Sequence, residues 1–92
     1  MTETSWEIYQ ECKRGEITPE EARKQIEQTQ EGDVAWAAFC MRHCGFASDE
    51  WARKQIERGI GDVVYVAFLM REFGYASKGW LEEILNEHWR KS

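Results

Sequence analysis

Three side chains that could bind a metal lie within a stretch of five residues. Cys40, His43 and Cys44 have the spacing i, i+3, i+4, which places them on one face of a helix. Cys12 could supply a fourth ligand, and zinc prefers such sulfur and nitrogen ligands. The alternative is that these thiols pack as small hydrophobic groups. We favour packing and expect no metal and no cofactor, because both helical cysteines align with large apolar residues in the repeat described below.

The residues suited to general base catalysis are two histidines, His43 and His88. Neither is placed by its spacing beside a serine or cysteine that it could activate. The chain also lacks a glycine-rich phosphate loop and the HExxH pattern of zinc proteases. We therefore expect a protein that is not an enzyme and has no catalytic residue.

The net charge of −5 and the pI near 5.0 oppose direct binding to nucleic acid, because the field repels phosphates. The acidic excess is concentrated in the first third of the chain, where Glu3, Glu7 and Glu11 recur at four-residue steps. Such a face commonly serves solubility alone. It could instead present carboxylates to a basic groove, and this gives our second hypothesis of an acidic nucleic-acid mimic or anti-defence protein that blocks a nucleic-acid-binding complex.

The chain repeats itself. Residues 32–51, GDVAWAAFCMRHCGFASDEW, align with residues 61–80, GDVVYVAFLMREFGYASKGW, at an offset of 29, and ARKQIE occurs at both 22–27 and 52–57. Residues 1–31 form a more divergent copy. We expect one domain, residues 1–92, made of three units at about 4–31, 32–60 and 61–90.

Helix start and stop signals divide each unit into two helices. Thr4 and Thr18 each precede a glutamate by three residues, as in a capping box, and glycines follow the first helix of each unit. The predicted helices span residues 5–14, 19–30, 34–43, 49–58, 63–73 and 78–89. Residues 63–70 alone would suit a buried strand equally well, but the aligned alanine-rich stretch favours a helix. The predicted fold is all-α, with three tandem helical hairpins in a short solenoid or compact six-helix bundle.

The last inner helix, residues 63–73, is apolar all round, although the end of a stack should have a polar face. Either the sixth helix covers it or another chain does. Our leading hypothesis is a cytoplasmic, non-enzymatic protein-interaction module, a small inhibitor, adaptor or immunity-type factor that docks onto a larger partner. A homodimer through this hairpin is a further possibility, and no membrane partner is expected. The expected contact residues are Val64, Val66, Leu69, Trp80 and Trp89.

Overall fold

The computed structural model describes residues 3–89, and this part of the chain contains six α-helices and no β-strand. The helices are α1 (Ser5–Lys13), α2 (Pro19–Gln28), α3 (Val34–His43), α4 (Asp49–Glu57), α5 (Val63–Glu72) and α6 (Lys78–His88). Consecutive helices pack in pairs, α1 with α2, α3 with α4 and α5 with α6. The predicted all-α architecture is confirmed, and residues 63–70 are helical. Residues 1, 2 and 90–92 of the predicted domain lie outside the described part.

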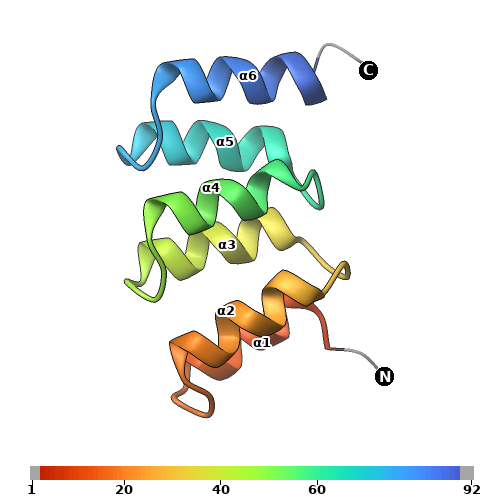
Figure 1. Ribbon diagram of the computed structural model, residues 1–92, viewed down its shortest axis with the longest axis vertical. Coiled ribbons are helices and arrows are strands. Elements are labelled where there is room, and N and C mark those ends of the chain that lie inside the picture. Colours follow the sequence, from red (N-terminus) through yellow and green to blue (C-terminus); the bar gives the residue numbers. More distant parts are fainter. Residues whose placement is uncertain (1–2, 90–92) are drawn as a thin grey trace.

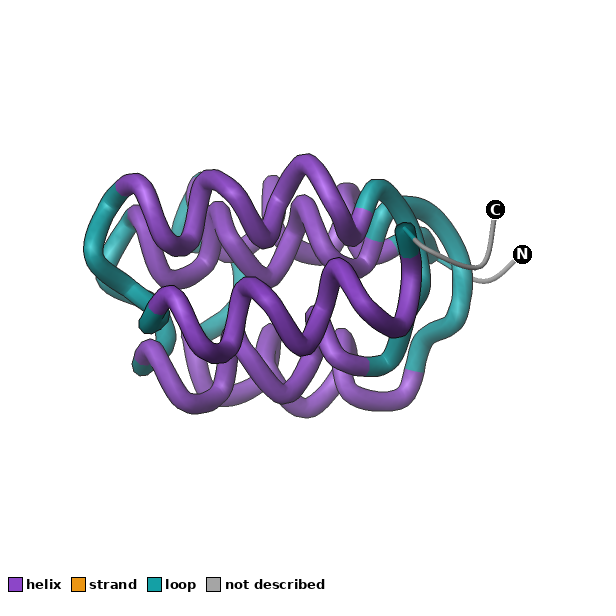
Figure 2. Tube along the Cα trace, turned by 90° about the horizontal axis from the view of Figure 1, so that it is seen from above, coloured by secondary structure: helices purple, strands orange, loops and turns teal. Residues whose placement is uncertain are grey.

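The three hairpins stack along an axis of 38 Å, with the other dimensions 28 and 15 Å. Contacts between hairpins run mainly through the first helix of each, α1 with α3 and α3 with α5 (Figure 1). Figure 1 shows α1 behind α2, whereas α6 lies above α5, so the pairs turn along the stack. The helices remain roughly parallel or antiparallel when the molecule is seen along its length (Figure 2). Each hairpin contacts its sequence neighbours, which is the organisation of a solenoid.

Side-chain caps fix where the helices begin. Thr4 accepts a hydrogen bond from the backbone N–H of Glu7, and the Glu7 carboxylate accepts one from the Thr4 N–H. Thr18 and Glu21 form the same reciprocal pair at α2. These bonds satisfy backbone donors that have no partner within the helix. The capping boxes expected from the sequence are therefore present.

Asp33 joins the second hairpin to the third. Its Oδ1 accepts from the N–H of Trp36 at 2.9 Å, capping α3, and from the N–H of Asp62 at 3.1 Å. Asp62 occupies the N-cap position of α5 but makes no side-chain capping bond. Gly61 has φ +103°, and a Cβ added there would lie 2.0 Å from Asp33 Oδ1. Only glycine therefore allows the two loops to approach this closely.

The core consists of two apolar clusters, one at each junction between hairpins. Helix α3 contributes to both, because it lies between the two neighbouring hairpins. Ala37 and Met41 belong to the cluster with the first hairpin, whereas Ala38 and Phe39 belong to the cluster with the third. The three alanines of α3 are fully buried, as close helix packing requires. In the described chain no helix is both long and apolar enough to cross a bilayer.

Candidate partner-binding surface

In the second and third hairpins, a tryptophan on the second helix donates a hydrogen bond to the second helix of the preceding hairpin. Trp51 Nε1 donates to Glu27 Oε2 at 2.7 Å, and Trp80 Nε1 donates to Glu57 Oε2 at 2.7 Å. Trp51 and Trp80 occupy equivalent positions in the repeat, and so do Glu27 and Glu57. The same bond is therefore made at both internal junctions.

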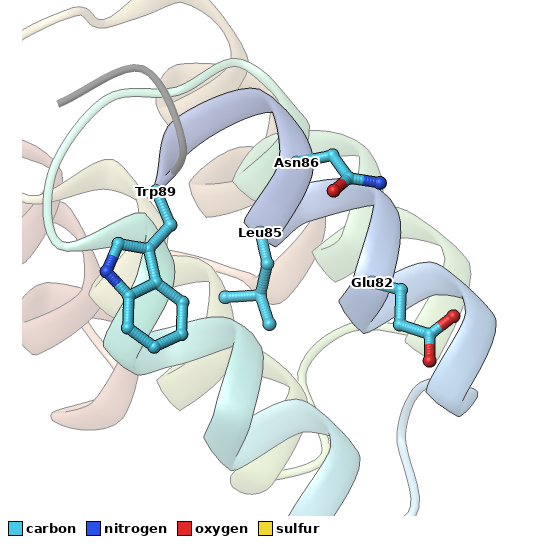
Figure 3. A pocket seen from close by; sticks show the side chains of 4 residues that line it. All are labelled: Glu82, Leu85, Asn86 and Trp89. Carbon is cyan, nitrogen blue, oxygen red and sulfur yellow. The ribbon is translucent and has the colours of Figure 1, made fainter.

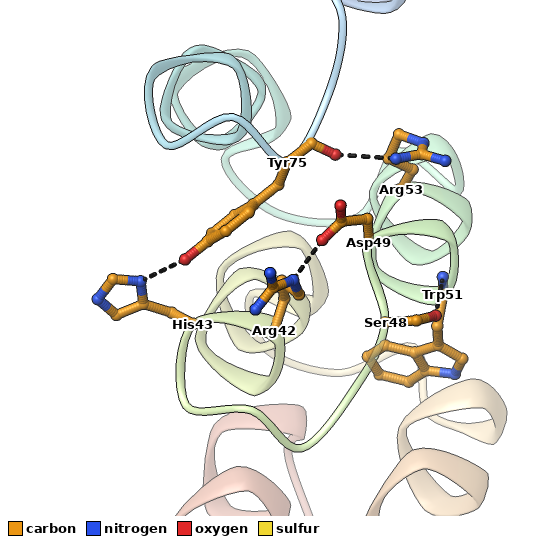
Figure 4. Close-up of polar contacts among 7 residues, drawn as sticks. All are labelled: Arg42, His43, Ser48, Asp49, Trp51, Arg53 and Tyr75. Carbon is orange, nitrogen blue, oxygen red and sulfur yellow. Dashed lines mark hydrogen bonds and ion pairs between the residues drawn. The ribbon is translucent and has the colours of Figure 1, made fainter.

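An arginine makes the second recurring contact. Arg23 donates to the backbone carbonyl of Phe46, and Arg53 Nη1 donates to the carbonyl of Tyr75 at 2.8 Å. Figure 4 shows Tyr75 with its carbonyl toward Arg53 and its hydroxyl toward His43, whose Nδ1 lies 3.0 Å from the hydroxyl oxygen. Each arginine thus binds the glycine turn of the next hairpin.

Each hairpin has an aromatic side chain on its first helix at the position where the following hairpin packs. The exposed fraction of this side chain differs between the hairpins. Tyr9 is 4% exposed and Phe39 is 5% exposed, because the next hairpin covers each of them. The Tyr9 hydroxyl lies 3.1 Å from Cys44 Sγ, and the Phe39 ring lies 5.7 Å from that of Phe73. Phe68 is the equivalent residue of the third hairpin and is 44% exposed. Trp89 contacts its ring from the side, with centroids 6.3 Å apart.

Helix α6, the second helix of the third hairpin, carries a groove. Its lining residues include the repeat positions of the recurring arginine and glutamate on α2 and α4. Glu82, Leu85, Asn86 and Trp89 line a hollow of about 470 Å³, which we call the terminal groove. Figure 3 shows Leu85 and Trp89 pointing from α6 toward α5, while Glu82 and Asn86 point the other way. The spacing i, i+3, i+4, i+7 makes these residues one face of α6.

Repeat alignment identifies this face as the one that binds the next hairpin in the two internal copies. Glu82 aligns with Arg23 and Arg53, and Asn86 aligns with Glu27 and Glu57. In the same register, Leu85 aligns with Ile26 and Ile56, both fully buried, whereas Leu85 itself is half-buried. The terminal groove is therefore the site that a fourth hairpin would cover.

The opposite end of the stack is closed by carboxylates. Glu7 aligns with the buried Ala37, and Glu11 aligns with the buried Met41, both of which face the preceding hairpin. A terminal repeat needs a polar outer surface, and these substitutions supply one. The two ends of the solenoid consequently differ, since the outer side of the first hairpin carries glutamates, whereas Phe68 and Trp89 are exposed on the third hairpin.

The five apolar residues expected to contact a partner differ in their exposure to solvent. Val66 is fully buried against the second hairpin, and Trp80 is engaged with Glu57 at the internal junction. Both therefore stabilise the stack and offer little surface. Val64 and Leu69 are half-buried on α5, and Trp89 is 57% exposed at the terminal groove.

The expected acidic residues lie together on the first hairpin. Glu3 and Glu7 are exposed, and Glu11 is partly exposed. A side-chain hydrogen bond with the Glu3 carboxyl raises the pKa of Glu11, because one of the two groups must keep its proton to donate that bond; the like charge of Glu3 adds to the effect. The Glu7 carboxylate also caps α1, so its role in the helix is structural.

The cysteines and His43 do not assemble into a ligand set. Among residues 3–89 no group of three or more His, Cys, Asp or Glu side chains is arranged to hold a metal ion. Cys12 is buried, and burial raises its pKa. Burial also raises the pKa of Cys40 to about 11, while Cys44 is exposed beside Tyr9. High thiol pKa values disfavour the thiolate that binds metals.

Sequence reasoning missed Phe68 and three of the groove residues. The third copy, LEEILN at 81–86, differs from ARKQIE at all six positions, and two of these changes lie in the groove as polar residues: Arg to Glu at Glu82 and Glu to Asn at Asn86. Four of the five large hydrophobic side chains exposed within residues 3–89 also belong to the third hairpin. No protein family, curated protein or solved structure matches this chain, so its function has to be inferred from its own geometry.

Proposed function

We propose that this protein is a docking module that binds a larger partner protein through the open end of its third hairpin. The observation that carries the proposal is the exposure of Phe68, which is 44%, against 4% for Tyr9 and 5% for Phe39 at equivalent positions. The first two are covered by the following hairpin. A partner surface would cover the third in the same way.

The surface around Phe68 has the composition of an interface centre. Trp89 contacts the Phe68 ring, and the same tryptophan lines the terminal groove together with Leu85, Glu82 and Asn86. Aromatic anchors surrounded by polar residues contribute most of the binding free energy in many protein complexes. A module of this kind acts as an adaptor, inhibitor or immunity-type factor by occupying its partner, without bond-making chemistry.

The glutamates at the acidic end also have a structural explanation. Glu7 and Glu11 replace residues that would otherwise expose apolar surface at the start of the stack. End capping accounts for their presence and position. The acidic nucleic-acid mimic stays a prediction from the sequence.

Site-specific photocrosslinking tests the proposed function. The photoreactive residue p-benzoylphenylalanine would replace Phe68, or in the control Tyr65, in protein expressed in the native host. Tyr65 is also on α5 and is 53% exposed, but it stacks on Trp36 away from the groove. We expect a partner protein to crosslink at position 68, and the purified partner to lose at least about tenfold in affinity with Phe68→Ala. Equal crosslinking at both positions, or unchanged affinity, would overturn the proposal.

A further inference from the structure

One polar group of the terminal groove, the Glu82 carboxylate, reverses the chemistry of the internal junctions. Arg23 and Arg53 donate hydrogen bonds to the backbone carbonyl of the next turn. At the equivalent position Glu82 carries a carboxylate, which accepts hydrogen bonds and bears a negative charge. A neighbour that offers only a carbonyl there would be repelled, whereas a lysine or arginine would be attracted.

The remaining groove positions keep the internal pattern. Glu27 and Glu57 accept the indole N–H of a tryptophan. Asn86 replaces them but still has an amide oxygen that can accept the same kind of donor. Leu85 is an apolar lining residue of the hollow, whose volume of about 470 Å³ lies in the range of ligand pockets.

A second copy of this chain is a poor occupant. Head-to-tail stacking would place Glu82 against the turn of the acidic first hairpin, where Glu16 aligns with Phe46 and Tyr75. A twofold dimer through the groove would instead bring Glu82 and the exposed Glu83 and Glu87 close to their own copies. Like charges that meet in an interface oppose binding. Charge complementarity therefore points to a different, basic protein.

Resting on the proposed function, we propose that the terminal groove receives a basic helical segment of the partner, which takes the place of a fourth hairpin. An apolar or aromatic side chain of that segment enters between Phe68 and Leu85. A donor on the segment bonds to the Asn86 side-chain oxygen, and a lysine or arginine pairs with Glu82. Among residues 3–89 Glu82 forms no ion pair of its own, so its carboxylate is available.

A designed peptide pair tests the charge requirement. The template is residues 73–89, because this turn and helix cover Phe39 and bind Arg53 and Glu57 at the internal junction. One fluorescein-labelled, stapled peptide keeps the natural sequence, and the other has lysine in place of its three glutamates. Fluorescence anisotropy would measure the binding of each peptide to the full chain. We expect the basic peptide to bind at least about tenfold more tightly.

Protein variants locate the binding. Phe68→Ala is expected to weaken binding of the basic peptide at least about tenfold, while the matched control Tyr65→Ala should change it less than about twofold. Glu82→Arg removes the charge partner, so it should weaken the basic peptide about two- to fivefold and strengthen binding of the natural peptide. The effect of Glu82→Arg should shrink as salt is added.

Several results would overturn the inference. Three results would exclude a binding site for a basic helix. They are equal affinity for both peptides, no binding of either peptide, and binding of the basic peptide that Phe68→Ala does not weaken. A dimer in sedimentation equilibrium that Phe68→Ala dissolves would assign the groove to a second copy. If the crosslinked partner loses affinity with Phe68→Ala but not with Glu82→Arg, the proposed function stands and this inference fails.

Discussion

Phe39 and Phe68 are both phenylalanines and occupy equivalent positions in the repeat. Comparing their alanine variants therefore measures how much the following hairpin contributes to the free energy of unfolding. Phe39 is 5% exposed and contacts the rings of Phe73 and Tyr75. Phe39→Ala should lower the free energy of unfolding by about 3–5 kcal/mol, the usual cost for a buried phenylalanine. Phe68 is 44% exposed, so roughly half of that burial is absent and no closed cavity forms. We expect Phe68→Ala to cost about 1–1.5 kcal/mol.

Urea unfolding followed by circular dichroism at 222 nm would measure both variants. The readout avoids tryptophan fluorescence, because Trp36 contacts Phe39 and Trp89 contacts Phe68. In a chain of this length each 1 kcal/mol corresponds to about 4–8 °C in Tm. Phe39→Ala should therefore lower Tm by more than about 10 °C and Phe68→Ala by less. Equal losses would refute the reasoning, because Phe68 would then be covered within the chain and the open end would not exist.

Three further predictions concern other parts of the structure. Gly61→Ala should destabilise the fold by about 2 kcal/mol more than Gly74→Ala, as measured by urea unfolding, because both glycines have positive φ but only a Cβ at Gly61 overlaps Asp33; equal costs would contradict the close approach. Iodoacetamide at about pH 8 should label the native protein at Cys44 alone, since burial raises the pKa of the two other cysteines; mass spectrometry would detect any second label. The native pKa of Glu11 is raised above its ordinary value, so ionisation of Glu11 destabilises the folded state as pH rises through that range. Glu11→Gln should accordingly raise Tm at pH 7, and this gain should disappear below about pH 4; a gain that persists in acid would exclude ionisation of Glu11 as its cause.

The repeat made most of the fold predictable. Residues 63–70 have a strand-like composition, but their alignment with the alanine-rich helix at 34–41 correctly assigned them as helix. Thr4 and Thr18 marked helix starts because capping depends on residues only three positions apart. Local chemistry of this kind is readable from sequence, since the partners lie within one turn.

The candidate site was harder to predict, because it depends on which hairpin covers which residue. Val66 is as apolar as a contact residue should be, yet it is fully buried in the cluster between the second and third hairpins, since its repeat position faces the preceding hairpin. Trp80 is committed to Glu57 on α4, a partner 23 residues away. From its sequence Phe68 resembles the buried Phe39, but within residues 3–89 it is 44% exposed.

The sequence by itself determined the helices, their caps and the threefold repetition, because each of these depends on short-range spacing and on the similarity of the copies. The tertiary structure decided which helix faces are exposed to solvent. Stacking buries a residue only if a neighbouring hairpin exists on its side, so equal residues at equal positions become core in the middle of the array and surface at its end. That difference leaves Phe68 and the terminal groove exposed, while Glu7 and Glu11 close the opposite end.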